Sequence, residues 1–170
     1  MATPAEQLRP GEWNSLEPYA QLVRSLLPRA SSIAVFDANA NPRWSNDTAT
    51  WPELVQAVEQ SARDAAGDSA SAGQLRVLEG DMPLYLCWLR DDDSRALLAV
   101  VAIQCRASGD AEPRSFSFVH ALIRPALECL RRELVARHSI DLLAENLSAR
   151  DRDLELVLAV SSRDGVRPGD

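Results

Sequence analysis

A helical pattern that runs from residue 116 to residue 162 constrains this chain more than any other feature of its sequence. Apolar side chains recur there at steps of three and four residues, which is typical of one face of an α-helix. As a single helix the segment would extend roughly 70 Å at ~1.5 Å per residue, about twice the breadth of a small domain. A domain of this size cannot cover both ends of such a rod, so we expect a partner to cover the distal half.

The pattern divides into two stripes that differ in phase. The proximal stripe runs from Phe116 to Leu134, and the distal stripe restarts at Ile140 with the spacing of a heptad, after a change of phase at residues 137–141 that resembles a stutter. We predict that the distal stripe forms a parallel coiled coil in a homodimer, weakened by Arg150 at one inward position. The alternative is an amphipathic helix that folds back onto its own domain. The predicted dimer residues are Leu127, Leu130, Leu134, Ile140, Leu143, Leu147, Arg150, Leu154 and Val157.

Pro125 lies inside the proximal stripe. Proline removes one backbone donor and clashes with the preceding turn, at a cost of up to ~3 kcal/mol in a helix interior. The sequence therefore predicts either a kink at this position or a break between a short first helix and the main one.

The residues before the long helix predict an α+β domain. Nearly continuous apolar runs in the central strands indicate that helices cover both faces of a five-stranded antiparallel sheet. We expect the helix that opens at Trp51 to cover one face, and the first helix together with the start of the last one to cover the other. The predicted elements are helices over residues 12–27 and 50–66, and strands over residues 31–36, 43–45, 74–78, 82–90 and 95–106.

Three segments carry a resemblance to a known family. The strand–turn–strand SIAVFDANANPRWSN (residues 32–46) is similar to the opening hairpin of GAF/PAS sensor domains. The segments PALECLRREL (125–134) and LSARDRDLELVL (147–158) resemble the linker helix that joins such a domain to an output domain in bacterial signalling proteins, including GGDEF or EAL proteins of cyclic-di-GMP turnover. The resemblance implies a sensor domain at 12–115 and a coiled-coil signalling helix at 116–162, between a flexible lead-in (1–11) and a flexible tail (163–170).

Large aromatic side chains are the candidates for a ligand pocket. Trp44, Trp51, Tyr85 and Trp88 could line a pocket against the sheet, although such rings more often belong to the core of a small domain. His120 lies beside the proximal stripe, where a structural role or a role as a pH sensor is open.

Several classes of function are excluded or disfavoured. The sequence has no GxSxG, Walker, HExxH or GxGxxG motif, so we do not expect an enzyme. Its three cysteines and two histidines lack the close spacing of metal ligands, and we predict no metal and no cofactor. A net charge of −7 argues against binding of nucleic acid. The sequence has neither an apolar leader nor an apolar run of ~18 residues, which predicts a cytoplasmic protein without a membrane segment.

These observations combine into one functional prediction. We expect a non-catalytic regulatory sensor that forms a homodimer and passes a signal through its last helix to a downstream output domain, with a small-molecule ligand left open. The alternative is a stand-alone dimeric interaction or scaffold protein without a ligand.

Overall fold

The computed structural model describes residues 16–46, 51–68, 70–107 and 113–164, in two units. The first unit, residues 1–132, is the sheet domain, and the helical residues 133–164 of the second unit are the distal segment. The predicted lead-in (1–11) lies outside the described residues, as do residues 165–170 of the predicted tail. The elements are α1 Glu17–Leu26, β1 Ala30–Asp37, β2 Pro42–Ser45, α2 Trp51–Gly67, β3 Gly73–Leu78, β4 Met82–Arg90, β5 Leu97–Cys105 and α3 Phe116–Asp164.

One antiparallel sheet organises the sheet domain, with the strand order β2-β1-β5-β4-β3. Val101 in the middle of β5 pairs with Val35 of β1 on one side and with Cys87 of β4 on the other. The central position of β5 explains its continuous apolar run, because a strand with two neighbours and two covered faces has no wet side. The number of strands and their antiparallel pairing agree with the sequence prediction.

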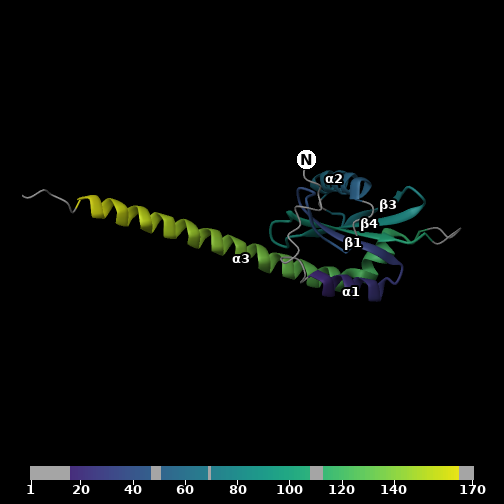
Figure 1. Ribbon diagram of the computed structural model, residues 1–170. Helices are drawn as coiled ribbons and strands as arrows, with labels where there is room; N and C mark the ends of the chain where they lie inside the picture. The colour runs from purple at the N-terminus through teal and green to yellow at the C-terminus, as the bar shows by residue number, and fades with distance from the viewer. Residues whose placement is uncertain (1–15, 47–50, 69, 108–112, 165–170) are drawn as a thin grey trace, which may run out of the picture. The chain divides into compact units, whose positions relative to one another are not determined.

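Helix α2 covers one face of the sheet (Figure 1). Even-numbered strand residues point to this side, since successive side chains of a strand alternate between its faces. They pack against the buried face of α2 in a cluster that includes Phe36, Leu54, Val58, Leu84, Leu86, Trp88 and Val100.

Helix α1 and the first turns of α3 cover the opposite face (Figure 1). Ala20 and Val23 are the buried residues of α1, and Val119, Ile123, Ala126, Leu127 and Leu130 are those of α3. This arrangement agrees with the expected division of the two faces between the helices.

Helix α3 continues through Pro125, so the predicted break at this residue is wrong. Ile123 and Leu127 flank the proline in sequence, and both are buried in the sheet domain. Burial of such side chains stabilises by about 1.5–3 kcal/mol each, which offsets the ~3 kcal/mol that proline costs inside a helix.

The turn between β4 and β5 is longer than predicted, because β5 begins two residues later than the sequence indicated. Arg95 has a φ of +59° and its N–H donates to the carbonyl oxygen of Asp91, so β5 begins at Leu97 rather than at residue 95. The Asp91 carboxylate accepts hydrogen bonds from both the backbone N–H and the hydroxyl of Ser94. Asp92 of the same turn forms an ion pair of 2.8 Å with Arg131 of α3. The acidic residues therefore stabilise the turn itself and connect it to α3.

Candidate functional site

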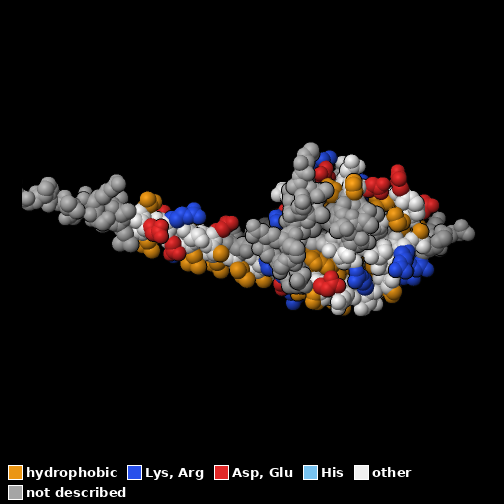
Figure 2. All heavy atoms as spheres, in the orientation of Figure 1, with side chains coloured by type: hydrophobic (Ala, Val, Ile, Leu, Met, Phe, Trp, Pro, Cys, Tyr) orange, Lys and Arg blue, Asp and Glu red, His pale blue; other side chains and the backbone are white. Residues whose placement is uncertain are grey.

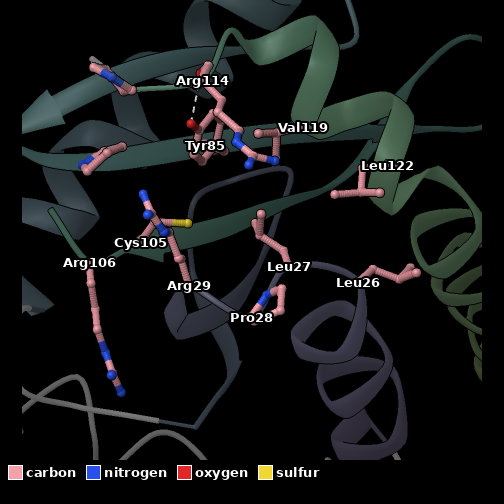
Figure 3. Close-up of a pocket in the computed structure, with 12 residues that line it drawn as sticks. Leu26, Leu27, Pro28, Arg29, Tyr85, Cys105, Arg106, Arg114, Val119 and Leu122 are labelled. Atoms are coloured by element: carbon pink, nitrogen blue, oxygen red, sulfur yellow. Dashed lines mark hydrogen bonds between the residues drawn. The ribbon is translucent and has the colours of Figure 1, made fainter. Parts of the chain in front are cut away.

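A pocket of about 250 Å³ lies on the face of the sheet that α1 and α3 cover (Figure 3). The residues after α1, the start of β4, the end of β5 and the start of α3 surround it. Its lining residues are Leu26, Leu27, Pro28, Arg29, Pro83, Tyr85, Cys105, Arg106, Pro113, Arg114, Val119 and Leu122.

Two hydrogen bonds hold the rim of the pocket in place. The backbone N–H of Arg106 donates to the carbonyl oxygen of Arg29 at 3.1 Å, which extends the pairing of β1 with β5 by one step. The Tyr85 hydroxyl donates to the carbonyl oxygen of Arg114 at 2.8 Å, which ties the residues before α3 to β4. Three arginines from three separate segments are thereby brought to one pocket.

The lining of the pocket is positively charged at neutral pH. Burial raises the pKa of Tyr85, and the neighbouring Cys105 adds to this shift. Burial likewise raises the pKa of Cys105, to about 11, although the charge of Arg29 acts in the opposite direction. Both groups are neutral near pH 7, and none of the lining residues is acidic. The three arginines therefore provide all the formal charge of the lining.

The aromatic residues predicted to form a pocket do not come together. Trp44 and Trp88 are buried, and Trp88 belongs to the cluster under α2, where its indole N–H donates to Ser61 Oγ at 2.8 Å. Tyr85 is three residues away from Trp88 on the same strand and lines the pocket on the opposite face. The side chain of Trp51 lies outside the described residues. Because side chains alternate between the two faces of a strand, residues 85 and 88 lie on different faces, and the sequence alone could have indicated that they do not share a pocket.

The pocket arginines were missed by the sequence reasoning. Arg29 precedes β1, Arg106 follows β5 and Arg114 precedes α3, so no local motif joins them. Their meeting depends on the register that pairs Ala30 with Cys105. No pattern in the sequence indicates which residues of β1 and β5 pair with each other, so the meeting of these arginines could not be predicted.

The distal segment carries the second candidate site, an apolar row that we call the distal stripe. It consists of Ile140, Leu143, Leu147 and Leu154, whose exposed fractions lie between 60 and 64 %. Figure 2 shows hydrophobic side chains gathered along one side of this segment. Arg150 occupies the expected place in the row and is exposed, whereas the side chain of Val157 lies outside the described residues.

The proximal leucines do not belong to an exposed seam. Leu127 and Leu130 are each only 4 % exposed, because they pack inside the sheet domain. Leu134 is partly exposed. Leu127 and Leu130 were predicted as dimer contacts, and the structure uses them as core residues instead.

His120 stacks on Phe116, with 5.4 Å between the ring centroids. Burial lowers the pKa of His120, and the charge of Arg124 lowers it further. The imidazole is therefore neutral at pH 7, which fits the structural role among the two that the sequence left open.

The part of the chain that the structure describes offers neither a metal site nor a membrane-spanning helix. No group of three or more His, Cys, Asp or Glu side chains there could hold a metal ion. No helix there combines the length and apolar character that crossing a bilayer requires.

The fold is similar to that of MglB proteins. Myxococcus xanthus MglB matches with a TM-score of 0.50 at 14 % sequence identity, over 74 % of this chain and 98 % of that one. The gliding protein MglB from Thermus thermophilus matches with a TM-score of 0.44 at 18 % identity, over 71 % and 93 % of the two chains. An MglB described as having a tetrameric arrangement matches with a TM-score of 0.44 at 18 % identity, over 70 % and 89 %. No protein-family model matches the chain, and no curated protein matches it either.

The prediction of a GAF/PAS-like domain is therefore wrong, because the α+β fold of the chain is similar to that of MglB instead. The prediction rested on the order of helices and strands, which more than one family shares, and on three similar segments (residues 32–46, 125–134 and 147–158), none of which is a residue motif specific to one family. The long helix is present as α3, but its assignment as the signalling helix of a GAF/PAS protein is wrong together with that fold, and its proximal residues Leu127 and Leu130 are core residues rather than coiled-coil contacts. The link to cyclic-di-GMP came from the same resemblance and finds no support.

Proposed function

We propose that this chain is a non-catalytic regulatory module that self-associates through the distal stripe. The observation that carries the proposal is the exposure of four large apolar side chains on one side of the distal segment. Scattered apolar residues are normal on a protein surface, but a contiguous row of this kind marks an interaction site.

A second copy of the chain is the partner that this row fits best. The stripe has the spacing of three and four residues that lets two identical helices interdigitate. Arg150 interrupts the row between Leu147 and Leu154, and a single polar position of this kind selects one register at a cost in stability.

The expected association is weak and reversible. Eight side chains from two copies, each buried further by a little over half, would contribute about 10 kcal/mol at roughly 2 kcal/mol per fully buried side chain. Association itself costs about 4–15 kcal/mol in lost translational and rotational freedom. The two amounts are comparable, so small changes in the protein or its surroundings would shift the equilibrium between monomer and dimer.

Helix α3 would carry the regulatory effect. It begins in the core of the sheet domain and includes the distal segment, so an event at its proximal end and an event at its distal end act on one element. In this proposal the association state of the stripe connects the sheet domain to an output domain. The alternative is an interaction protein whose stripe binds a different protein.

Sedimentation velocity over a range of concentrations tests the proposal with a matched pair of variants. Leu154→Glu places a charge in the stripe, whereas Leu156→Glu places the same charge two residues away, at a leucine that is 64 % exposed and outside the row. We expect Leu154→Glu to be monomeric at concentrations where the unmodified chain and Leu156→Glu are dimeric, with the same far-UV circular dichroism in all three. A Leu154→Glu variant that dimerises as well as Leu156→Glu refutes the stripe as the contact, and a monomeric unmodified chain refutes self-association.

A further inference from the structure

We propose that the arginine-lined pocket of the sheet domain binds a small organic anion that has a carboxylate or phosphate head and a short apolar body. Arg29 and Arg114 would hold the head. In Figure 3 their side chains extend toward the pocket from different sides, whereas Arg106 points away. This inference is independent of the self-association proposed above.

The charge of the pocket is opposite to that of the chain. The protein has a net charge of −7, yet the lining holds three arginines and no acidic residue. Within the part of the chain that the structure describes, seven arginines have a carboxylate within 4.0 Å, and Arg29 and Arg114 are among those that have none. Two guanidinium groups without a carboxylate partner beside one cavity favour an anion from solution.

The position of Arg114 is already organised. Its guanidinium lies over the ring of Phe118, with 5.0 Å between Cζ and the ring centroid. The hydrogen bond from Tyr85 holds its backbone carbonyl. A side chain that is held in place before binding loses less conformational entropy when it meets a ligand.

The rest of the lining is suited to an apolar body. Leu27 and Val119 are buried, and Leu26 and Leu122 are partly exposed beside them. The volume of about 250 Å³ lies below the usual range of roughly 300–1,000 Å³ for drug-sized ligands, so a short chain or a single ring is the expected size. A hydrophilic ion alone would leave this apolar wall uncovered.

Isothermal titration calorimetry with four probes separates the contributions of head and body. We expect octanoate and octyl phosphate to bind, and the ratio of their affinities identifies the preferred head. Octan-1-ol lacks the charge and inorganic phosphate lacks the apolar body. We therefore expect each of them to bind at least roughly tenfold more weakly than the octyl anions. Equal binding of octan-1-ol and octanoate would overturn the proposal, as would the absence of binding by both octyl anions.

Substitution of exposed arginines assigns the head to its partners without disturbing the core. Arg29→Ala and Arg114→Ala should each weaken octanoate binding roughly tenfold or more, because each removes a charge-assisted hydrogen bond. Arg63→Ala is the control of equal charge, since Arg63 lies on α2 at the opposite face, and it should change the affinity by less than about twofold. If Arg63→Ala weakens binding as much as the pocket variants do, the anion is attracted by net charge and the pocket assignment is wrong.

Discussion

Gly73 at the start of β3 offers the sharpest test of how the sheet domain is packed. Its φ of +143° is a conformation that residues with a Cβ rarely adopt. An added Cβ would lie 2.0 Å from the carbonyl oxygen of Leu86 and 2.7 Å from Cζ of Phe116. Gly73→Ala therefore meets both an unfavourable backbone angle and a steric clash.

The expected loss follows from these two terms. Backbone strain at a position of this kind costs about 1–3 kcal/mol, and forced overpacking costs typically about 1–3 kcal/mol. The Leu86 carbonyl belongs to the backbone of β4, so it cannot move aside without disturbing the pairing of β3 with β4. We expect Gly73→Ala to lower the free energy of unfolding by about 3–5 kcal/mol, a large part of the roughly 5–15 kcal/mol of an ordinary domain.

Urea unfolding followed by far-UV circular dichroism measures this loss beside two graded controls. Gly80 has a φ of +77° and no atom within 4 Å of its added Cβ, so Gly80→Ala should cost only the strain, about 1 kcal/mol. Gly67 ends α2 with open space and no positive φ, so Gly67→Ala should be neutral or stabilise by up to about 1 kcal/mol. A Gly73→Ala variant no less stable than Gly80→Ala would refute the close contact between β3, β4 and the start of α3.

Two further predictions concern polar contacts of the sheet domain. Ser61→Ala should destabilise the protein by about 1–3 kcal/mol, because the buried indole N–H of Trp88 loses its acceptor. Ser25→Ala removes an exposed helical hydroxyl and serves as the control. Equal urea midpoints for the two variants would contradict the prediction. Hydrogen bonds from Arg131, and to a lesser extent from Arg132, lower the pKa of Glu128 from its ordinary value of 4.5 to about 2. The ionised carboxylate therefore stabilises the folded state above pH 4.5, and this contribution is lost as the pH falls from 4.5 toward 2. Because Glu128 is partly exposed, the effect is at most ~1 kcal/mol, and acid unfolding of Glu128→Gln that matches the unmodified chain would count against it.

Local patterns in the sequence were sufficient to locate the elements of this fold. Strand β4 was predicted with the bounds that the structure has, and α2 and α3 begin within one residue of the predicted positions. Such patterns depend on neighbours within one or two turns, which is why they survive without knowledge of the tertiary structure. The family assignment failed because an order of elements is a weaker signal than a residue motif.

Tertiary structure decided what each pattern is used for. Leu130 and Ile140 both belong to stripes of similar spacing, yet Leu130 is 4 % exposed and Ile140 is 64 % exposed. Spacing indicates that a helix has an apolar face, but burial depends on whether another element lies opposite that face.

The arginine-lined pocket likewise separates what the sequence determines from what only the tertiary structure decides. The sequence determined that Arg29, Arg106 and Arg114 stand next to element ends, where exposed charged residues are ordinary. Only the pairing of β1 with β5 and the return of α3 across the sheet bring them to one cavity. The physical reason is that charge and periodicity are properties of short segments, whereas a site forms where segments far apart in sequence meet.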